Sequence, residues 1–302
     1  INAFERGFNL IMKKISLLAA AVLLISSLLF CFSACSSDGS EIEDSTAAYS
    51  YVDSATPAKT SSEEVLHYFN ELVNKIKSEK PAVSYNIEKS IPNDSIRVTK
   101  KGAEQSEETD SSLDAINDSA KGLKDLVLEN IKRTRGNIAY GEENSDILFV
   151  KGESWASKLT ENDIKYASMK EVGDNYYITI AFNDLTSAEA QEVLTKAFDL
   201  RDKDDILNSA EFAKTNAYLK LNDYDVVYSG CTITATVNRF TDELKNVYYY
   251  KAANVTADMT GNGTLANYGD VSVMFKLEDK ANFDITWENG YPTSPLDTSN
   301  AQ

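Results

Sequence analysis

The chain is poor in the residues on which many catalytic and metal sites depend. Its 302 residues include one histidine, His67, and three cysteines. A serine hydrolase needs a histidine to accept the proton of the serine, but His67 shares the polar face of an expected helix with Glu63 and Glu71, which indicates a solvated surface residue. One imidazole and so few thiols also cannot complete the ligand set of a zinc site. We therefore assign no catalytic residue, no cofactor and no metal site.

Positive charge is also scarce. The chain has 30 Lys and Arg against 47 Asp and Glu, which gives a formal net charge of −17 at pH 7. Nucleic-acid binding requires Lys and Arg to displace counterions from phosphates, and the sequence contains no basic stripe that could do so. We expect no nucleic-acid partner, and we expect surfaces of anionic lipid to repel the chain.

An uncharged apolar segment lies near the N-terminus, over residues 15–32, directly after Met12, Lys13 and Lys14. This order is typical of a secretory signal peptide. Small residues precede Cys35, and the segment Phe32-Ser33-Ala34-Cys35 resembles the lipobox of bacterial lipoproteins, with Phe32 where the family usually has Leu. The resemblance implies that signal peptidase recognises Phe32, Ser33 and Ala34, and that Cys35 carries diacylglycerol. The alternative is an uncleaved transmembrane helix, because the segment is just long enough to span a bilayer.

The resemblance to a lipobox predicts the organisation of the N-terminal part. Residues 1–11 lie upstream of Met12 and are expected to be an over-extended reading frame, and residues 12–34 are the signal peptide. Their removal takes away three cations and one anion, which lowers the formal charge from −17 to −19. The mature chain would be held by Cys35 on the extracytoplasmic face of the cell membrane, or on the outer membrane of a Gram-negative cell. Only Cys231 would then remain as a free thiol, so no intramolecular disulfide is expected.

Residues 35–60 are rich in Ser, Thr, Asp and Glu, and they predict a flexible tether between the lipid and a folded domain. The domain is expected over residues 61–290, as one unit or as two subdomains, 61–200 and 201–290, with a C-terminal tail at 291–302. Three helices are predicted: one from Ser61 to Pro81, one over 113–131 with Gly136 as its cap, and one after Thr186.

Alternating apolar residues predict strands over the rest of the domain. One hairpin is expected at 83–98 around Pro92-Asn93-Asp94, and a second at 164–182 around Gly173. Four further strands are expected at 231–237, 247–259, 271–277 and 283–287. Together they predict an α+β fold: an antiparallel sheet, curved like a half-barrel, with two or three amphipathic helices packed on one face.

Aromatic residues are the feature that could mark a ligand. Tyr248, Tyr249 and Tyr250 follow one another in a predicted strand, so alternation places Tyr249 in the core and Tyr248 and Tyr250 outside it. Together with Trp155, these two outward tyrosines are candidate ligand-binding residues, because an exposed ring can stack on a sugar or an acyl chain. The alternative is that they are ordinary strand-forming residues.

A lipidated chain, a tether, and helices on a broad antiparallel sheet resemble the lipid-carrying lipoproteins of the LolA and LppX type in element order over residues 61–290. The resemblance rests on no shared motif, so no ligand-binding residue is carried over. It implies a non-catalytic envelope lipoprotein that binds an apolar ligand, such as a lipid, or a cell-wall component. Two alternatives remain: a surface adhesion module that presents tyrosines to a glycan or a protein, and a hydrolase built from carboxylates.

Overall fold

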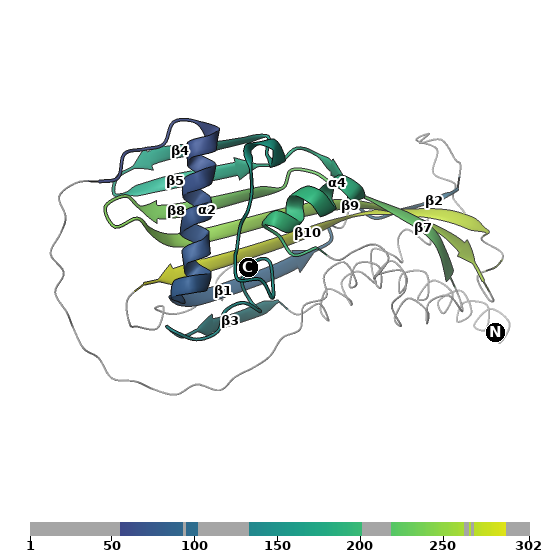
Figure 1. Cartoon of the computed structure of the whole chain (residues 1–302). Coiled ribbons are helices and arrows are strands. Elements are labelled where there is room, and N and C mark those ends of the chain that lie inside the picture. Colours follow the sequence, from purple (N-terminus) through teal and green to yellow (C-terminus); the bar gives the residue numbers. More distant parts are fainter. Residues whose placement is uncertain are drawn as a thin grey trace.

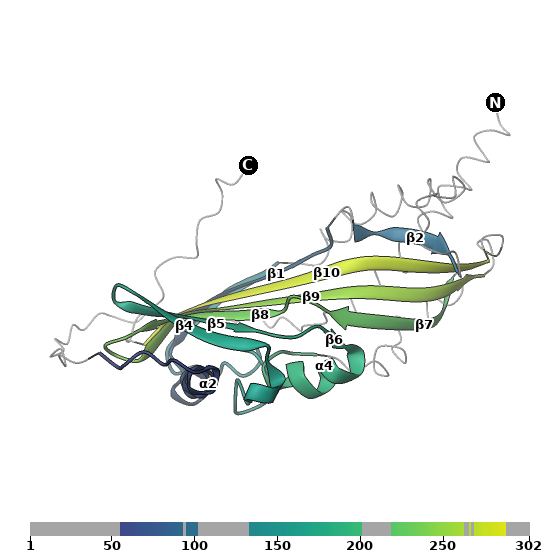
Figure 2. The same ribbon diagram turned by 90° about the horizontal axis from the view of Figure 1, so that it is seen from above.

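The computed structural model describes residues 55–92, 95–101, 133–200, 219–262, 266 and 269–287. Over these residues the fold is mostly one antiparallel β-sheet of ten strands that does not close into a barrel (Figure 1). Two α-helices, α2 (Ser62–Glu79) and α4 (Ser187–Val193), lie on the same face of the sheet (Figure 2). The prediction of an antiparallel sheet combined with helices is confirmed at this level. Residues 1–54, with Phe32, Ser33, Ala34 and Cys35, and the predicted helix over 113–131 lie outside the described residues.

The strand order through the sheet is β3-β1-β10-β9-β8-β5-β4. The strand bounds are β1 Ala82–Ser90, β2 Arg97–Lys100, β3 Thr134–Ile138, β4 Tyr166–Val172, β5 Asn175–Ala181, β6 Leu185–Thr186, β7 Leu219–Tyr228, β8 Thr232–Asn238, β9 Glu243–Gly261 and β10 Asp270–Thr286.

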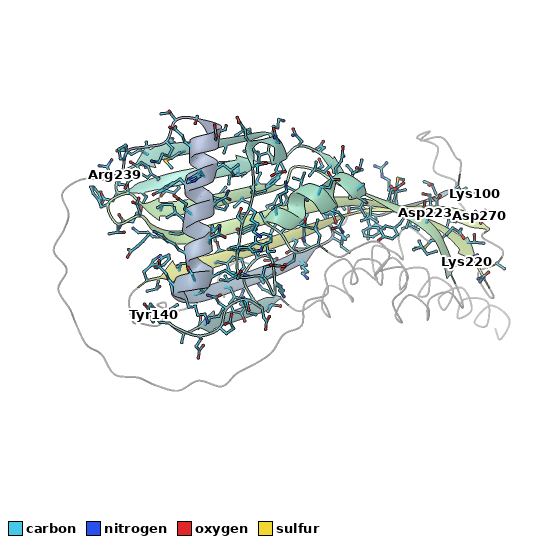
Figure 3. All side chains as sticks on the ribbon, viewed as in Figure 1. Lys100, Tyr140, Lys220, Asp223, Arg239 and Asp270 are labelled. Atoms are coloured by element: carbon cyan, nitrogen blue, oxygen red, sulfur yellow. The ribbon has the colours of Figure 1, made fainter. Side chains whose placement is uncertain are left out.

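The two longest strands, β9 and β10, extend from one end of the sheet to the other. One half of β9 pairs with β8 and the other with β7, while β10 pairs with β1 along one half and with β2 along the other. The sheet therefore has a broad part, crossed by α2, and a narrower extension of β2, β10, β9 and β7 (Figure 1). Figure 3 places Arg239 at the end of the broad part, and Lys220, Asp223 and Asp270 at the tip of the extension.

Alternation along the strands gives the sheet one apolar and one polar face. In β9 and β10 the odd-numbered positions are mostly buried on the helix side, and cross-strand pairs such as Phe275 with Val255 and Phe283 with Val247 fill the core. The even-numbered positions carry mostly polar side chains on the opposite face, which no described helix covers (Figure 2). We call this second surface the open face. The period-2 pattern therefore separates core from solvent along both strands.

The N-terminal capping signals of α2 and α4 are confirmed. The Ser61 hydroxyl accepts a hydrogen bond from the Glu64 N–H, and the Glu64 carboxylate accepts one from the Ser61 N–H, which forms the predicted capping box. The helix ends at Glu79, and the next residue, Lys80, caps it in the left-handed conformation with φ of 50°. Thr186 and Glu189 form the same box at the start of α4. None of the helices in the described ranges is long and apolar enough to cross a membrane.

The predicted hairpin at 83–98 is wrong. Strands β1 and β2 do not pair with each other but lie end to end along the same side of β10. The cause is the length of β10, which continues unbroken where two strands, 271–277 and 283–287, were expected. A strand this long offers hydrogen-bonding positions to both segments, so the turn at Pro92 shifts the chain along β10 and does not reverse it. The hairpin around Gly173 is confirmed, because β4 and β5 pair in antiparallel register there.

Gly136 was predicted as a helix cap, and this is also wrong. It lies within β3 and pairs with Tyr85 of β1. A Cβ at position 136 would lie 2.7 Å from the Tyr85 Cζ, so the absence of a side chain lets the tyrosine ring pass over the strand. A glycine that predicted a helix cap thus serves close packing in a strand.

The last residues of the expected tether contact the sheet. The Thr56 N–H donates to the Arg239 carbonyl oxygen at 2.8 Å, and its hydroxyl donates to Asp242 Oδ2 at 2.7 Å. The Tyr176 hydroxyl donates to the Thr56 carbonyl oxygen. Contact with the folded part therefore begins by Thr56, at the same end of the sheet as Arg239 (Figure 3).

Candidate functional site

The three candidate ligand-binding residues lie in two different places. Tyr248 and Tyr250 are on the open face, in register with Asn282 and Lys280 of β10. Trp155 belongs to the loop between β3 and β4, which packs on the helix side of the sheet. Tyr249 points to the helix side and is 4% exposed, which confirms the prediction that it joins the core. The structure therefore does not bring Trp155 together with the two tyrosines.

On the open face, Tyr250 is held by neighbouring charged residues. Its hydroxyl donates to Glu278 Oε1 at 3.0 Å, and the same carboxylate pairs with Lys276 at 2.8 Å and Lys280 at 3.1 Å. The Lys276 hydrogen bond, with those of Lys280 and Tyr250, lowers the pKa of Glu278 to about 2. The hydroxyl of Tyr250 is thus already used within the protein.

Two tyrosines that the sequence analysis did not select are more exposed on this face. Tyr166 of β4 is 46% exposed and Tyr177 of β5 is 44% exposed. Alternation along the predicted strand indicates that Tyr177 points away from the core, because it lies between Tyr176 and Ile178, and those two residues are buried. The exposed aromatic side chains of the open face lie toward its β4 edge.

On the helix side, Trp155 forms part of a groove of about 480 Å³. The walls are the 150–158 part of the loop and the 195–200 segment that follows α4. The Lys158 N–H donates to the Lys196 carbonyl oxygen at 2.9 Å, which joins the two walls. The Lys158 Nζ lies 4.0 Å from the centre of the Trp155 ring, a cation–π contact. We call this site the Trp155 groove; its lining residues are Val150, Lys151, Glu153, Trp155, Lys158, Thr195, Lys196, Phe198, Asp199 and Leu200.

Helix α2 fixes the loop that carries Trp155. The buried Lys77 Nζ donates to the carbonyl oxygens of Val150 at 2.9 Å and Glu153 at 3.0 Å, which satisfies an ammonium group that burial would otherwise destabilise. Burial lowers the pKa of Lys77, and nearby carboxylates oppose that shift. The Asn74 side-chain oxygen accepts the N–H groups of Ala156 and Ser157. A loop without regular structure thus holds a defined position on the helix.

A second, smaller cavity of about 40 Å³ adjoins this groove, and both share Phe198 and Asp199 as lining residues. At about 10–15 Å³ for each water, it has room for a few water molecules. Its aromatic walls are tightly packed, since Phe149 stacks on Tyr249 with ring centres 4.1 Å apart, and Phe283 meets Phe149 edge-on at 4.8 Å. The cavity is a gap between rings, too small for an acyl chain.

Charged groups surround this cavity. Lys251 Nζ lies 3.4 Å from Asp279 Oδ2 and donates to the Asp199 carbonyl oxygen at 2.9 Å. Burial raises the pKa of Asp199, although its carboxylate accepts the Lys151 N–H at 2.7 Å and lysines lie nearby. The Tyr249 hydroxyl is buried and has no hydrogen-bond partner among the described residues, and burial raises its pKa well above 10.

The chemistry of this region favours binding. The described residues contain no group of three or more His, Cys, Asp or Glu side chains placed to hold a metal ion. Apolar walls, a tryptophan, and a few charged groups at defined positions are instead the usual components of a small-molecule site. No protein-family model, no curated protein and no solved structure matches the chain.

Proposed function

We propose that the chain is a membrane-anchored, extracytoplasmic lipoprotein without catalytic activity, which binds an apolar ligand or an envelope component in the Trp155 groove. The observation that carries the proposal is this groove itself. Its volume of about 480 Å³ falls within the roughly 300–1,000 Å³ of typical ligand pockets. Its walls combine an aromatic ring, apolar side chains and lysines.

The packing of the core favours the groove over the sheet interior as the ligand site. In the expected half-barrel arrangement, an apolar ligand would lie between the helices and the sheet. Over the described residues that space is occupied by side chains such as Phe69, Tyr249 and Phe283, and the cavity beside Tyr249 measures about 40 Å³. We therefore assign the ligand to the Trp155 groove.

Ligand binding is tested by mass spectrometry of an organic extract of purified residues 36–302, a form that contains every described helix and strand. We expect a co-purified apolar or amphipathic molecule near one equivalent, and its loss in Trp155→Ala. Tyr177→Ala, on the open face, is the matched control and should retain the molecule. An empty wild-type protein that stays folded would contradict binding in the groove.

The anchor is tested separately, by labelling cells with a radioactive or clickable palmitate analogue. We expect label in the wild type and in Cys31→Ser, and none in Cys35→Ser, because the lipobox resemblance assigns the lipid to Cys35. The Cys35→Ser protein should also leave the membrane fraction. Label that persists in Cys35→Ser would refute the anchor.

A second candidate function is surface recognition of a glycan or protein by the open face. The specific observation is the exposure of Tyr166 and Tyr177, since large aromatic rings on a monomer surface often mark contact sites. A glycan array with wild type and Tyr166→Ala/Tyr177→Ala tests it. Binding that is lost in the double variant and kept in Trp155→Ala would place recognition on the open face.

A further inference from the structure

The lining of the Trp155 groove has more basic than acidic residues, whereas the chain as a whole has more acidic ones. The whole sequence has 47 acidic and 30 basic residues, whereas the groove is lined by three lysines and two acidic residues. The lysines are Lys151, Lys158 and Lys196. A local excess of cations in an acidic protein favours an anionic ligand at that place.

Both acidic residues of the groove already accept hydrogen bonds from the protein. The Glu153 carboxylate accepts the Trp155 Nε1–H at 2.8 Å, and the Asp199 carboxylate accepts the Lys151 N–H at 2.7 Å. Lys196 pairs with Asp163 at 2.5 Å, outside the groove lining. Within the described ranges, the exposed Lys158 ammonium contacts the Trp155 ring and no carboxylate. It is therefore the cation best placed to meet a ligand.

The neighbouring side chains complete an amphipathic site. Trp155, Phe198 and Leu200 give the groove an apolar wall beside these lysines. Tyr249, whose buried hydroxyl has no partner among the described residues, lines the smaller cavity, which shares Phe198 and Asp199 with the groove. The groove thus combines an apolar wall with the Lys158 ammonium group.

We propose that the ligand of the Trp155 groove is an anionic amphiphile, whose carboxylate or phosphate group pairs with Lys158 and whose apolar part lies against Trp155 and Phe198. This inference rests on the proposed function and specifies its ligand class. A cationic amphiphile would place its charge beside the Lys158 ammonium group, and a neutral one would form no ion pair with it. Because the overall charge of −17 repels anions at long range, binding depends on contacts within the groove and weakens with added salt.

The experiment uses residues 36–302 and four single-chain amphiphiles below their micelle concentrations: dodecanoate, dodecyl phosphate, dodecyl maltoside and dodecyl trimethylammonium. Binding is followed by isothermal titration calorimetry. Intrinsic fluorescence of a Trp287→Phe variant provides a second readout, because Trp155 is then the remaining tryptophan of the two. We expect saturable binding of the two anionic compounds, with a blue shift of Trp155 emission. Tighter binding of dodecanoate would indicate a fatty-acid carboxylate as the anionic group, and tighter binding of dodecyl phosphate would indicate a phospholipid headgroup.

Two variants locate the anionic group. Lys158→Gln should weaken binding of the anionic compounds about fivefold, the upper value for one exposed ion pair, and leave dodecyl maltoside unchanged. Lys170→Gln, on β4 and the open face, is the matched control and should change nothing. Thermal unfolding of each variant checks that the fold is retained.

The outcomes separate the inference from the proposed function. Equal binding of anionic, neutral and cationic compounds, all lost in Trp155→Ala, would overturn the anionic class and leave the groove as a ligand site. Binding of none of the four, together with an empty organic extract, would overturn the proposed function itself. A Lys158→Gln protein that binds dodecanoate as tightly as wild type would remove Lys158 from the site.

Discussion

Lys251 of β9 and Asp279 of β10 face each other directly across the two longest strands, with 3.4 Å between Nζ and Oδ2. Both side chains are buried, at 6% and 8% exposure, in a core that is mostly apolar. Lys251 also donates to the Asp199 carbonyl oxygen, so one ammonium group joins both long strands to the 195–200 wall of the Trp155 groove. The pair thereby couples the sheet to the candidate site.

Loss of the lysine alone should be costly. We expect Lys251→Met to reduce the free energy of unfolding by about 3–5 kcal/mol, because Asp279 would remain buried without a counter-charge. The double variant Lys251→Met/Asp279→Leu should recover most of that loss. Urea denaturation measures both. Lys80→Met, which breaks an exposed pair with Glu143, is the control and should cost less than about 1 kcal/mol. A double variant no more stable than the single one would contradict this account.

Glu278 should make stability depend on acid pH. Its pKa is lowered from 4.5 to about 2, first by the Lys276 hydrogen bond. A carboxylate with a depressed pKa contributes stability above the unfolded-state value, and this contribution is lost as pH falls from about 4.5 toward 2. We expect the urea midpoint to fall over that window, and to fall less in Glu278→Gln. Lys276→Met should move the fall to higher pH. Identical profiles in wild type and Glu278→Gln would argue against the pairing.

Gly136 should tolerate no side chain. We expect Gly136→Ala to lower the free energy of unfolding by about 1–3 kcal/mol, because its Cβ would meet the Tyr85 ring and force it to move. In a Tyr85→Ala background the same substitution should cost much less, since the obstacle is gone. A thermodynamic cycle over the four proteins measures the coupling between the two positions. Additive effects would show that the ring is not the cause.

Cys231 should be inert toward thiol reagents. It is 1% exposed, and burial raises the pKa of its thiol, so little of the reactive thiolate is accessible in the native protein. In residues 36–302 we expect no labelling by iodoacetamide at pH 8, and complete labelling in urea. Ser154→Cys in a Cys231→Ala background, where the residue lies in the exposed part of the groove loop, should be labelled without denaturant. Rapid native labelling of Cys231 would indicate local opening of the sheet.

Local signals predicted the elements that are stabilised by near neighbours in sequence. The capping box and the apolar stripe of Val65, Phe69, Leu72 and Ile76 predicted α2, and Gly173, with φ of 59°, predicted the reversal between β4 and β5. Alternation also placed Tyr249 in the core. These features depend on residues a few positions apart, so their physical cause is present in the sequence itself.

The pairing of β1 and β2 and the position of the candidate site depended on distant residues. Both strands bind β10, which lies about 170–200 residues further along the chain, and no turn signal near Pro92 reports this partner. The Trp155 groove exists because Lys77 and Asn74 of α2 hold a loop more than 70 residues away, and because Lys158 bonds to Lys196. Trp155 was selected from its residue type alone, and its neighbours could not be identified from spacing.

The acidic charge, the lipobox expectation, the capping boxes of α2 and α4 and the two-faced strands follow from composition or from a period of a few residues, so they are predictable from the sequence. The strands that share β10, the face that the helices cover and the lysines that surround Trp155 are seen only in the folded protein. These features depend on contacts between residues far apart in the sequence. In such contacts, buried charged groups such as Lys77 and Lys251 obtain the acceptors that burial requires. A buried charge requires a partner, but the residues next to it in the sequence do not specify which one. The loop that forms one wall of the Trp155 groove is held by such a contact, with Lys77.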